Sequence, residues 1–339
     1  MSITESTLLP LVAQYEGQVP KPQAIWAIMP NTGFRLVERV MYRANEIEYL
    51  PRSLRHLYWL CQAPSLMRHE RVFDLTAALP QDYRLRIDRL AHCPDVLQQL
   101  NMAAELRLGL YFEQLYACLM THVLGWELLG HNLQVREQGR TLGELDFLLR
   151  NPLSGEVEHH EIAVKFYLAA GADDSHWYGP NSRDRLDLKT ERLLGHQVKM
   201  AEQPASRAML AEKGLPQSAR SHVLMPGYLF YPAGQSALPL PPNVSENHLR
   251  GDWLRASQVS ELRLETSVQL NKPDWLGPWH QTCHPDGMLA HAQASRIAAG
   301  GPPKLFAQLG QDGNSGVWHE TKRFFLVPDE WPYTSMEKA

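Results

Sequence analysis

Two neighbouring segments, residues 143–149 and 160–168, alternate apolar residues with residues that carry charge. This two-residue period is typical of β-strands, whose successive side chains point to opposite faces of a sheet. Between the two segments, residues 151–155 read Asn-Pro-Leu-Ser-Gly, which is a turn composition. The pattern therefore predicts two strands joined as an antiparallel hairpin.

The alternation also predicts which side chains share a face of this hairpin. In the first strand, one face holds the acids Glu144 and Asp146, and the other holds Leu145, Phe147 and Leu149. In the second strand, one apolar face lies opposite a mixed face of Glu161, Ala163, Lys165 and Tyr167. A buried charge is costly unless it is paired or binds a ligand such as a metal ion. We therefore expect the charged face to have a specific role.

Helical periodicity appears on both sides of the hairpin. The strongest helix is predicted over residues 107–126, with Glu113 one step from its apolar stripe, and residues 131–137 follow as a first strand. After the hairpin, residues 183–203 predict a long helix of alternating charge. Residues 222–231 then predict a strand in which Pro226-Gly227 marks a bulge or an edge position. The predicted order is helix, three strands, helix, strand.

The regions outside this central part have their own patterns. A short helix is predicted where apolar residues recur at helical spacing, at Leu8, Leu11, Val12 and Tyr15. Residues 50–105 predict several short helices that cover the sheet. Residues 238–242 are Pro-rich, and the chain beyond them is rich in Trp, Gly and Pro, with a strand predicted over residues 318–327. We interpret residues 1–105 as a mainly helical region, 106–232 as the core and 233–339 as an α+β extension.

Composition narrows the class of protein. The chain has 339 residues, 44% hydrophobic and 21% charged, as in soluble globular proteins. Its net charge of -4 is no bulk signature of a nucleic-acid-binding protein, so a polyanion site would have to be local. The four cysteines are scattered without a CxxC pair, which favours reduced thiols. No signal peptide and no membrane-length apolar stretch is present in the sequence, so we expect a cytoplasmic protein without a membrane partner.

The element order and the charged residues resemble the restriction-endonuclease-like, or PD-(D/E)XK, nuclease superfamily over residues 106–232. The segment Gly143-Glu144-Leu145-Asp146 is similar to the Gly-Glu-hydrophobic-Asp strand of many members. Over residues 50–332 the chain more closely resembles a bacterial family of unassigned function grouped with this superfamily. That resemblance is carried by residues 133–136, 139–146, 163–168, 177–181 and 184–186. It implies an α/β fold in which a mixed sheet is flanked by helices.

The resemblance also implies a site. Asp146 and Glu161 would bind Mg²⁺ (or Mn²⁺), with Glu113 as a third acid, and Lys165 would be the catalytic cation. Glu144 and Gln197 would support these residues, and Trp177, Arg183 and Arg185 would contact the substrate.

The chain departs from the superfamily pattern at one position. The acid-x-Lys signature places an acid two residues before the lysine, and here that position is Ala163. Glu161 lies on the same strand face but roughly 6.5–7 Å further along the strand. Either Glu161 reaches back with its longer side chain, or Glu144 or Glu113 substitutes for the missing acid, or the site does not cut.

Each candidate has a structural alternative. Asp146 could pair with Lys165 across the hairpin, and Trp177 could fix its loop in the core instead of stacking on bases. Arg183 and Arg185 alternate with acids, so they could form a solvated helix face with ion pairs. The segment His280-Gln281-Thr282-Cys283-His284 has zinc-ligand types but no second cluster at zinc spacing.

Three hypotheses follow for the function. The first is a Mg²⁺-dependent nuclease that hydrolyses phosphodiester bonds of DNA or RNA. The second is a module that kept the nuclease fold without catalysis and binds nucleic acid or a protein partner. The third is an ancillary structural protein of a larger complex.

Overall fold

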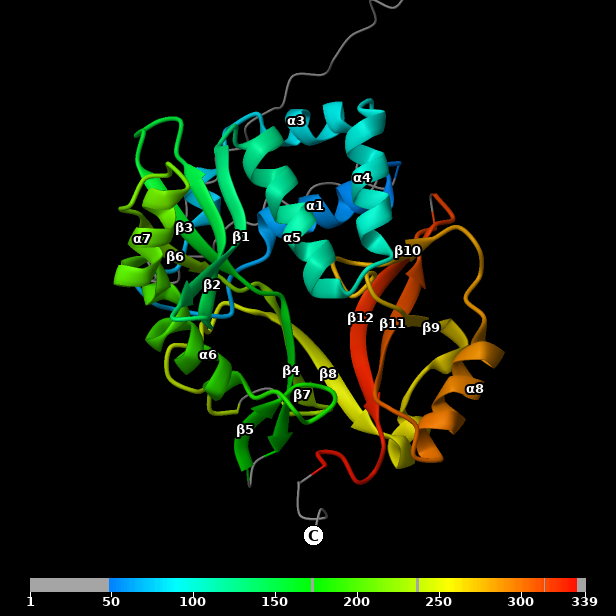
Figure 1. Ribbon diagram of the computed structural model, residues 1–339. Coiled ribbons are helices and arrows are strands. Elements are labelled where there is room, and N and C mark those ends of the chain that lie inside the picture. The colour runs from blue at the N-terminus through cyan, green and yellow to red at the C-terminus, as the bar shows by residue number, and fades with distance from the viewer. Residues whose placement is uncertain (1–48, 172–173, 236–237, 314, 334–339) are drawn as a thin grey trace, which may run out of the picture. The chain divides into compact units, whose positions relative to one another are not determined.

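Four strands form the first of two β-sheets, in the order β1-β2-β3-β6. The strands are β1 (Glu127–Glu137), β2 (Arg140–Arg150), β3 (Val157–Ile162) and β6 (Arg220–Leu224). The first three form an antiparallel meander, and β6 pairs with β3 in parallel. In this computed structural model the described residues are 49–171, 174–235, 238–313 and 315–333 (Figure 1). They all belong to one compact unit, residues 43–339, and the helix predicted around Leu8–Tyr15 lies outside them.

The second sheet has the strand order β5-β4-β7-β8-β12-β11-β9, and a short strand β10 also pairs with β12. Its strands are β4 (Lys165–Gly171), β5 (Asp174–Tyr178), β7 (Gly227–Pro232), β8 (Leu249–Arg255), β9 (Ser267–Leu270), β10 (His280–Gln281), β11 (Lys304–Gln311) and β12 (Trp318–Val327). The strand predicted over residues 318–327 is confirmed as β12. Residues beyond 233 thus supply β8, β9, β11 and β12 to the same sheet as β4 and β7.

The two sheets meet where β3 leads into β4 and β6 leads into β7. Backbone hydrogen bonds continue across both breaks, from Ala163 N to Leu224 O (3.0 Å) and from Lys165 N to Pro226 O (3.1 Å). Pro226 has no N–H to donate to the ladder, so the regular pairing is interrupted there. The irregularity predicted at Pro226-Gly227 is confirmed, whereas the single strand predicted over residues 160–168 is divided between the two sheets.

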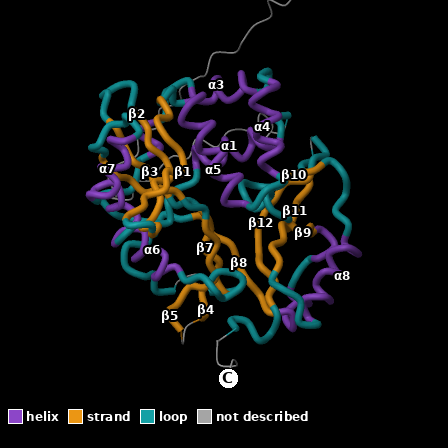
Figure 2. The backbone as a smooth tube through the Cα atoms, in the orientation of Figure 1, coloured by secondary structure: helices purple, strands orange, loops and turns teal. Residues whose placement is uncertain are grey.

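Helices surround the sheets, as Figure 2 shows. Before β1 come α1 (Arg52–Gln62), α2 (Leu75–Ala78), α3 (Tyr83–Leu90), α4 (Pro94–Ala104), α5 (Leu108–Cys118) and the π-helical turn η2 (Leu119–Val123). Between β5 and β6 come α6 (Leu186–Gly195), the 3-10 helix η3 (Gln197–Glu202) and α7 (Pro204–Glu212). The 3-10 helices η4 (Ala256–Glu261) and η5 (Leu264–Thr266) and helix α8 (Gly287–Ala298) lie between β8 and β11. The helices predicted over residues 50–105 are confirmed, and the protein is a mixed α/β structure.

The long helix predicted over residues 183–203 is wrong as a continuous element. It begins at Leu186, ends at Gly195 and resumes as η3, because His196 leaves helical geometry with φ −125° and ψ −60°. Gln197 therefore starts a new element that contacts β2, β3 and β6. This break directs Gln197 toward the first sheet.

The largest apolar cluster joins the N-terminal helices to both sheets. It contains Leu57 of α1, Leu115 of α5, Phe147 of β2, Phe230 of β7 and Phe325 of β12, all essentially inaccessible to solvent. Burying side chains of this size contributes roughly 1.5–3 kcal/mol each. The shared core keeps the ends of β2, β3 and β4 in a fixed relative position.

Candidate functional site

Asp146 lies where β2 separates from β3. The β2–β3 ladder extends from Arg150 opposite Val157 to Phe147 opposite His160 and goes no further. Beyond it, the backbone N–H of Ile162 donates to Asp146 Oδ2 at 3.0 Å. The Asp146 carboxylate therefore accepts the hydrogen bond that a backbone carbonyl of β2 would accept in a continued ladder. This bond fixes the Asp146 side chain at the point where β2 and β3 separate.

The predicted alternation of side chains along β2 fails at the same point. Leu145 packs with Met200 and Leu210, in the cluster beneath η3 and α7. Phe147, predicted on the same face, packs instead in the main core. The strand twists as it leaves β3, so faces assigned from a strict period of two do not hold across Asp146.

Glu161 is completely buried on β3 and both of its oxygens have partners. Gln197 Nε2 donates to Oε2 at 2.9 Å, and His159 Nε2 lies 3.0 Å from Oε1. His159 Nδ1 in turn lies 3.2 Å from Ser221 Oγ on β6. A buried acid needs such partners, and here they hold the side chain in one orientation. Gln197, predicted to support the site, is thus in contact with Glu161.

The carboxyl groups of Asp146 and Glu161 lie close enough to influence each other. Burial, together with the nearby Glu161, raises the pKa of Asp146 to about 7, although the hydrogen bond from Ile162 acts in the opposite direction. Glu113 and Glu144 raise the pKa of Asp146 further. Three acids from α5, β2 and β3 therefore disfavour the charged form of the Asp146 carboxyl group.

Glu113 is held at the edge of this acidic group. Asn132 Nδ2 donates to Glu113 Oε2 at 3.1 Å, and His131 Nε2 lies 3.4 Å from the same oxygen. Glu144 is half-buried on β2, opposite Gln134 of β1. Both acids lie outside the immediate contacts of Glu161.

Lys165 begins β4 and pairs with an acid that sequence reasoning did not select. Its Nζ lies 2.6 Å from Asp184 Oδ2, and the hydroxyl of Tyr167 donates to the same oxygen at 3.1 Å. The alternative pairing of Lys165 with Asp146 across the hairpin is therefore replaced by a pair with the loop before α6. Both side chains remain partly exposed, at 30% for Lys165 and 39% for Asp184.

A second lysine, Lys189 of α6, was considered only as one charge of a helix face and was not selected as a site residue. Its Nζ donates to Gln197 Oε1 at 3.2 Å, so it contacts the amide that holds Glu161. Burial and the nearby Lys165 lower the pKa of Lys189, and Glu161 opposes this effect. The signal in the sequence was only a charged residue on a helix, which is usually a solvated position. The tertiary structure instead places Lys189 close enough to both Lys165 and Glu161 for their charges to affect its pKa.

The three residues predicted to contact the substrate differ in their burial and in their partners. Trp177 is buried, with Nε1 donating to Pro239 O at 3.1 Å and its ring against Tyr231, so it cannot stack on a base in this arrangement. Arg185 pairs with Asp187 at 2.5 Å, in line with the ion-paired alternative. Arg183 is exposed and is the one of the three that faces solvent.

A further polar cluster lies within the first sheet, next to α5. His160 Nε2 donates to Glu158 Oε2 at 2.8 Å, and the hydroxyl of Tyr116 lies 2.5 Å from His160 Nδ1. His222 Nε2 is 3.3 Å from the same Glu158 oxygen. Burial lowers the pKa of His160 to about 4, although Glu158 opposes this effect. A neutral His160 with its proton on Nε2 can donate to Glu158 and accept at Nδ1 from the hydroxyl of Tyr116.

His56 should make the stability of the protein depend on pH. Burial and the charges of Arg55, Arg52 and Arg323 lower the pKa of His56 to about 3. The unfolded chain binds a proton below about pH 6.5 while the folded protein does not, so stability is lost as the pH falls. Between pH 7 and pH 5, this histidine should lower the free energy of unfolding by on the order of 2 kcal/mol. We expect His56→Gln to lose less stability than the parent over that interval, by about this amount, in urea unfolding at both pH values.

The difference between variant and parent is the quantity to compare, because Asp146 titrates in the opposite sense. Its raised pKa makes the folded protein take up a proton near pH 7, which adds stability on acidification. An equal loss in parent and His56→Gln between pH 7 and pH 5 would contradict the expected role of His56.

Comparison with known proteins places the chain in one family. Residues 55–327 match the family described as "Domain of unknown function (DUF1853)". The match covers most of the chain, so the protein belongs to this family. No curated protein and no solved structure matches. In the part of the chain that the structure describes, no helix is long and apolar enough to cross a membrane.

Proposed function

We propose that this member of the DUF1853 family is a Mg²⁺-dependent nuclease with a restriction-endonuclease-like core. The observation that carries the proposal is the hydrogen bond that Asp146 accepts from the backbone N–H of Ile162, the residue next to Glu161, where β2 separates from β3. Lys165 follows three residues after Ile162, where β4 begins. The chain thus offers two acids and one cation at the junction of its two sheets.

The element order supports the fold part of the proposal. Helix α5, strands β1 to β3, helix α6 and strand β6 occur in the same chain order as in the superfamily that the sequence resembles, with β4 and β5 between β3 and α6 and with η3 and α7 between α6 and β6. The sheet order β1-β2-β3-β6, with β6 parallel to β3, agrees with a mixed sheet flanked by helices. Fold similarity alone does not establish an activity, so the site must carry the functional argument.

The side chains present fit Mg²⁺ better than a metal enclosed by protein ligands. The described residues contain no group of three or more His, Cys, Asp or Glu side chains that could hold an ion. Mg²⁺ commonly keeps several waters and is bound through one or two carboxylates together with substrate phosphates. Asp146 and Glu161 match that requirement. When bound, the ion would supply an activated water and polarise the scissile phosphate.

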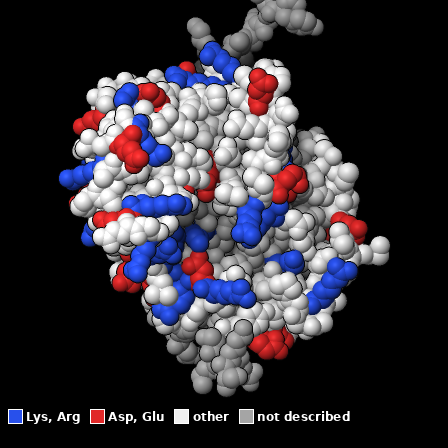
Figure 3. All heavy atoms as spheres, in the orientation of Figure 1, with Lys and Arg blue, Asp and Glu red and all other residues white. Residues whose placement is uncertain are grey.

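The protein's own residues would position these groups. Gln197 and His159 fix the carboxylate of Glu161. Glu161 would then replace the acid of the signature, at whose position the strand has Ala163. Lys165 would offset the charge of the phosphate, and Lys189 adds a second cation beside Gln197. Figure 3 shows Lys and Arg side chains gathered over the region of α6 and β4, beside a hollow in the surface. A local basic surface of this kind suits a polyanion despite the net negative charge of the chain.

One observation favours the second hypothesis, a nuclease fold that binds nucleic acid without cutting it. Lys165 already has an anionic partner, Asp184, at 2.6 Å. A phosphate would have to compete with this carboxylate for the ammonium group. The experiment must therefore measure cleavage and binding separately.

Cleavage of labelled single- and double-stranded DNA and RNA, with Mg²⁺ and with EDTA, tests the proposal. We expect Lys165→Ala to lower Mg²⁺-dependent cleavage by about 10²-fold or more, because a cation at the developing charge contributes most in the transition state. Binding of uncut substrate in Ca²⁺ should change less than cleavage. Lys199→Ala, an exposed lysine on η3, is the matched control and should cleave normally.

The opposite pattern would support the binding hypothesis. In that case the parent would bind nucleic acid in EDTA, with an affinity that falls with salt and survives Asp146→Ala, and would cut none of the substrates. Equal cleavage by the parent and Lys165→Ala would contradict the assigned role of Lys165.

A further inference from the structure

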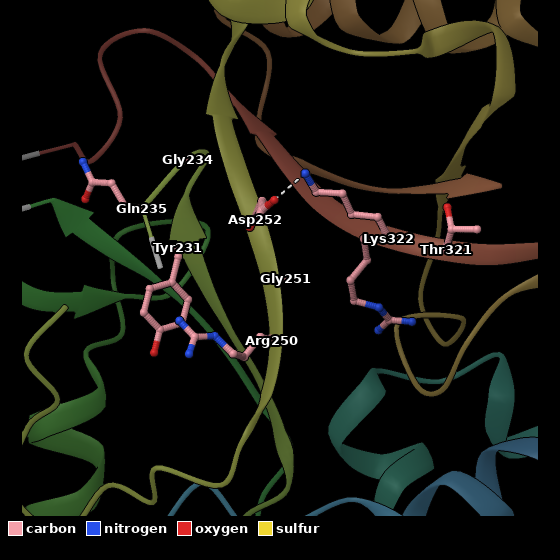
Figure 4. Close-up of a pocket in the computed structure, with 9 residues that line it drawn as sticks. Tyr231, Gly234, Gln235, Arg250, Gly251, Asp252, Thr321 and Lys322 are labelled. Carbon is pink, nitrogen blue, oxygen red and sulfur yellow. Dashed lines mark ion pairs between the residues drawn. The ribbon is translucent and has the colours of Figure 1, made fainter. Parts of the chain in front are cut away.

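A cavity of about 480 Å³ lies over strands β7, β8 and β12, and the cations that line it already have partners within the chain (Figure 4). Lys322 Nζ lies 2.5 Å from Asp252 Oδ2, and the guanidinium carbon of Arg250 lies 3.8 Å from the centre of the Tyr231 ring. Arg323 is buried and also pairs with an acid. This cavity therefore offers little uncompensated positive charge to a ligand.

Lys272, in the turn that follows β9, is a cation of a different kind. The turn is fixed by hydrogen bonds from Asp274 N to Asn271 O (2.7 Å) and from Trp275 Nε1 to Leu270 O (3.0 Å). Lys272 is exposed, and its Nζ lies 4.5 Å from the centre of the Trp275 ring. Among the described residues no carboxylate pairs with it. The contact with a ring leaves the positive charge of the ammonium group without a counter-charge.

The ring of Trp275 brings this lysine close to the proposed catalytic cation. Trp275 packs against Phe166 with a centroid distance of 5.1 Å, and Phe166 is the residue that follows Lys165. Partial burial and the charge of the nearby Lys165 lower the pKa of Lys272. The fold therefore holds Lys272 and Lys165 close enough for their charges to repel each other.

Helix α6 approaches Lys165 from the other face of β4. Successive side chains of a strand point to opposite faces. Phe166 packs in the main core, whereas Tyr167 packs in a second cluster with side chains of α6. Burial and the charges of Lys165 and Arg192 lower the pKa of Lys189. Arg192 is exposed, and no acid in the described part of the chain pairs with its side chain. Cations thus lie on both sides of Lys165.

We propose that a nucleic-acid strand crosses the start of β4, with one phosphate at Lys272, one beside Lys165 and one at Arg192. Like charges that the fold holds together repel one another, and the phosphates of a strand relieve this repulsion. Because cations flank Lys165 on both sides, the bond beside it is an internal bond of the strand. This substrate path rests on the proposed nuclease function and adds that the substrate needs no free end.

Fluorescence anisotropy in EDTA, with a linear and a circular labelled oligothymidylate of the same length, measures this binding apart from cleavage. We expect the two probes to bind with similar affinity, because a strand that crosses the site needs no end. Lys272→Met keeps an apolar stem against Trp275 without the charge. Lys272→Met and Arg192→Gln should each weaken binding several-fold and lower the slope of log affinity against log salt by about 0.7. Lys272→Arg should bind like the parent.

Lys213→Met, at an exposed lysine just after α7, is the matched control and should change neither the affinity nor the slope. Equal thermal unfolding of all variants would show that the fold is retained. Unchanged affinity and slope in Lys272→Met or in Arg192→Gln would overturn the proposal. So would a loss in Lys272→Arg as large as in Lys272→Met, tighter binding of the linear probe than of the circular one, or no binding of either probe.

Failure of the proposed nuclease function would look different. In that case both probes would bind and would respond to the substitutions as expected, but Mg²⁺ would lead to cleavage of neither. The strand path would then be supported as a binding surface without catalysis.

Discussion

Asp146→Asn is expected to lower Mg²⁺-dependent cleavage by about 10³-fold while leaving the fold intact. The substitution removes a carboxylate charge that the ion requires, which is a loss the neighbouring acids cannot replace at the same position. Asparagine is nearly the same size and keeps an oxygen that can accept the hydrogen bond from the Ile162 N–H. The loss should therefore appear in activity and in metal binding, and not in the unfolding temperature.

Glu161→Gln should produce a loss of similar direction, for a related reason. Glutamine keeps the shape of the side chain and one acceptor oxygen, but not the charge held between Gln197 and His159. Glu191→Gln, an exposed acid on α6, is the matched control and should cleave like the parent. Binding of Mn²⁺, followed by titration calorimetry, should weaken in both site variants and remain unchanged in the control.

Retained cleavage in both Asp146→Asn and Glu161→Gln would place the activity elsewhere. Loss of cleavage with unchanged Mn²⁺ binding would instead show that these acids act on the substrate and not on the ion. Cleavage shows whether the two carboxylates are needed for activity, and Mn²⁺ binding shows whether they bind the ion.

Gly227→Ala is expected to destabilise the protein by at least about 3 kcal/mol. Gly227 begins β7 with φ 157°, and an added Cβ would lie 1.7 Å from the carbonyl oxygen of Lys165. No rotamer can relieve this overlap, because both atoms are fixed by the backbone. The parallel strands β4 and β7 would have to move apart at the residue that carries the proposed catalytic cation.

Gly109→Ala is the control for that substitution. A Cβ at Gly109 would meet no atom within 4 Å, and the residue lies in α5, where alanine is the better helix former. We expect a change between zero and about 1 kcal/mol of added stability. Urea unfolding of both variants measures the difference, and equal stability of Gly227→Ala and the parent would contradict the close approach at this junction.

The local patterns in the sequence were sufficient to predict individual helices and strands. Alternation predicted the β2–β3 hairpin, and helical spacing predicted α1 to α5, because these signals depend on neighbours within a few residues. The composition of Pro226-Gly227 predicted an irregular strand, since proline cannot donate to a ladder. Charge on an otherwise apolar strand is unusual, and the resemblance to the PD-(D/E)XK superfamily implied that Asp146 and Glu161 form a metal site.

Other features depended on contacts between distant residues. The break at His196, which places Gln197 beside Glu161, is not visible in a run of alternating charges. The partner of Lys165 is Asp184, nineteen residues away, and the helix position of Lys189 gave no reason to expect contact with Gln197. The stacked pair of Arg250 and Tyr231 joins two strands whose pairing the sequence pattern did not predict.

The hairpin shows most clearly which features follow from local sequence and which depend on tertiary contacts. By itself, the sequence determined that Asp146, Glu161 and Lys165 would lie on extended segments, because a two-residue period is a local property of the chain. Only the tertiary structure decided that β2 leaves β3 at Asp146, that Glu161 is held by Gln197 and His159, and that Lys165 crosses into a second sheet beside Asp184. Those outcomes depend on how helices and strands far apart in the chain pack around one core, which sets the positions and charges of neighbours that no local pattern contains.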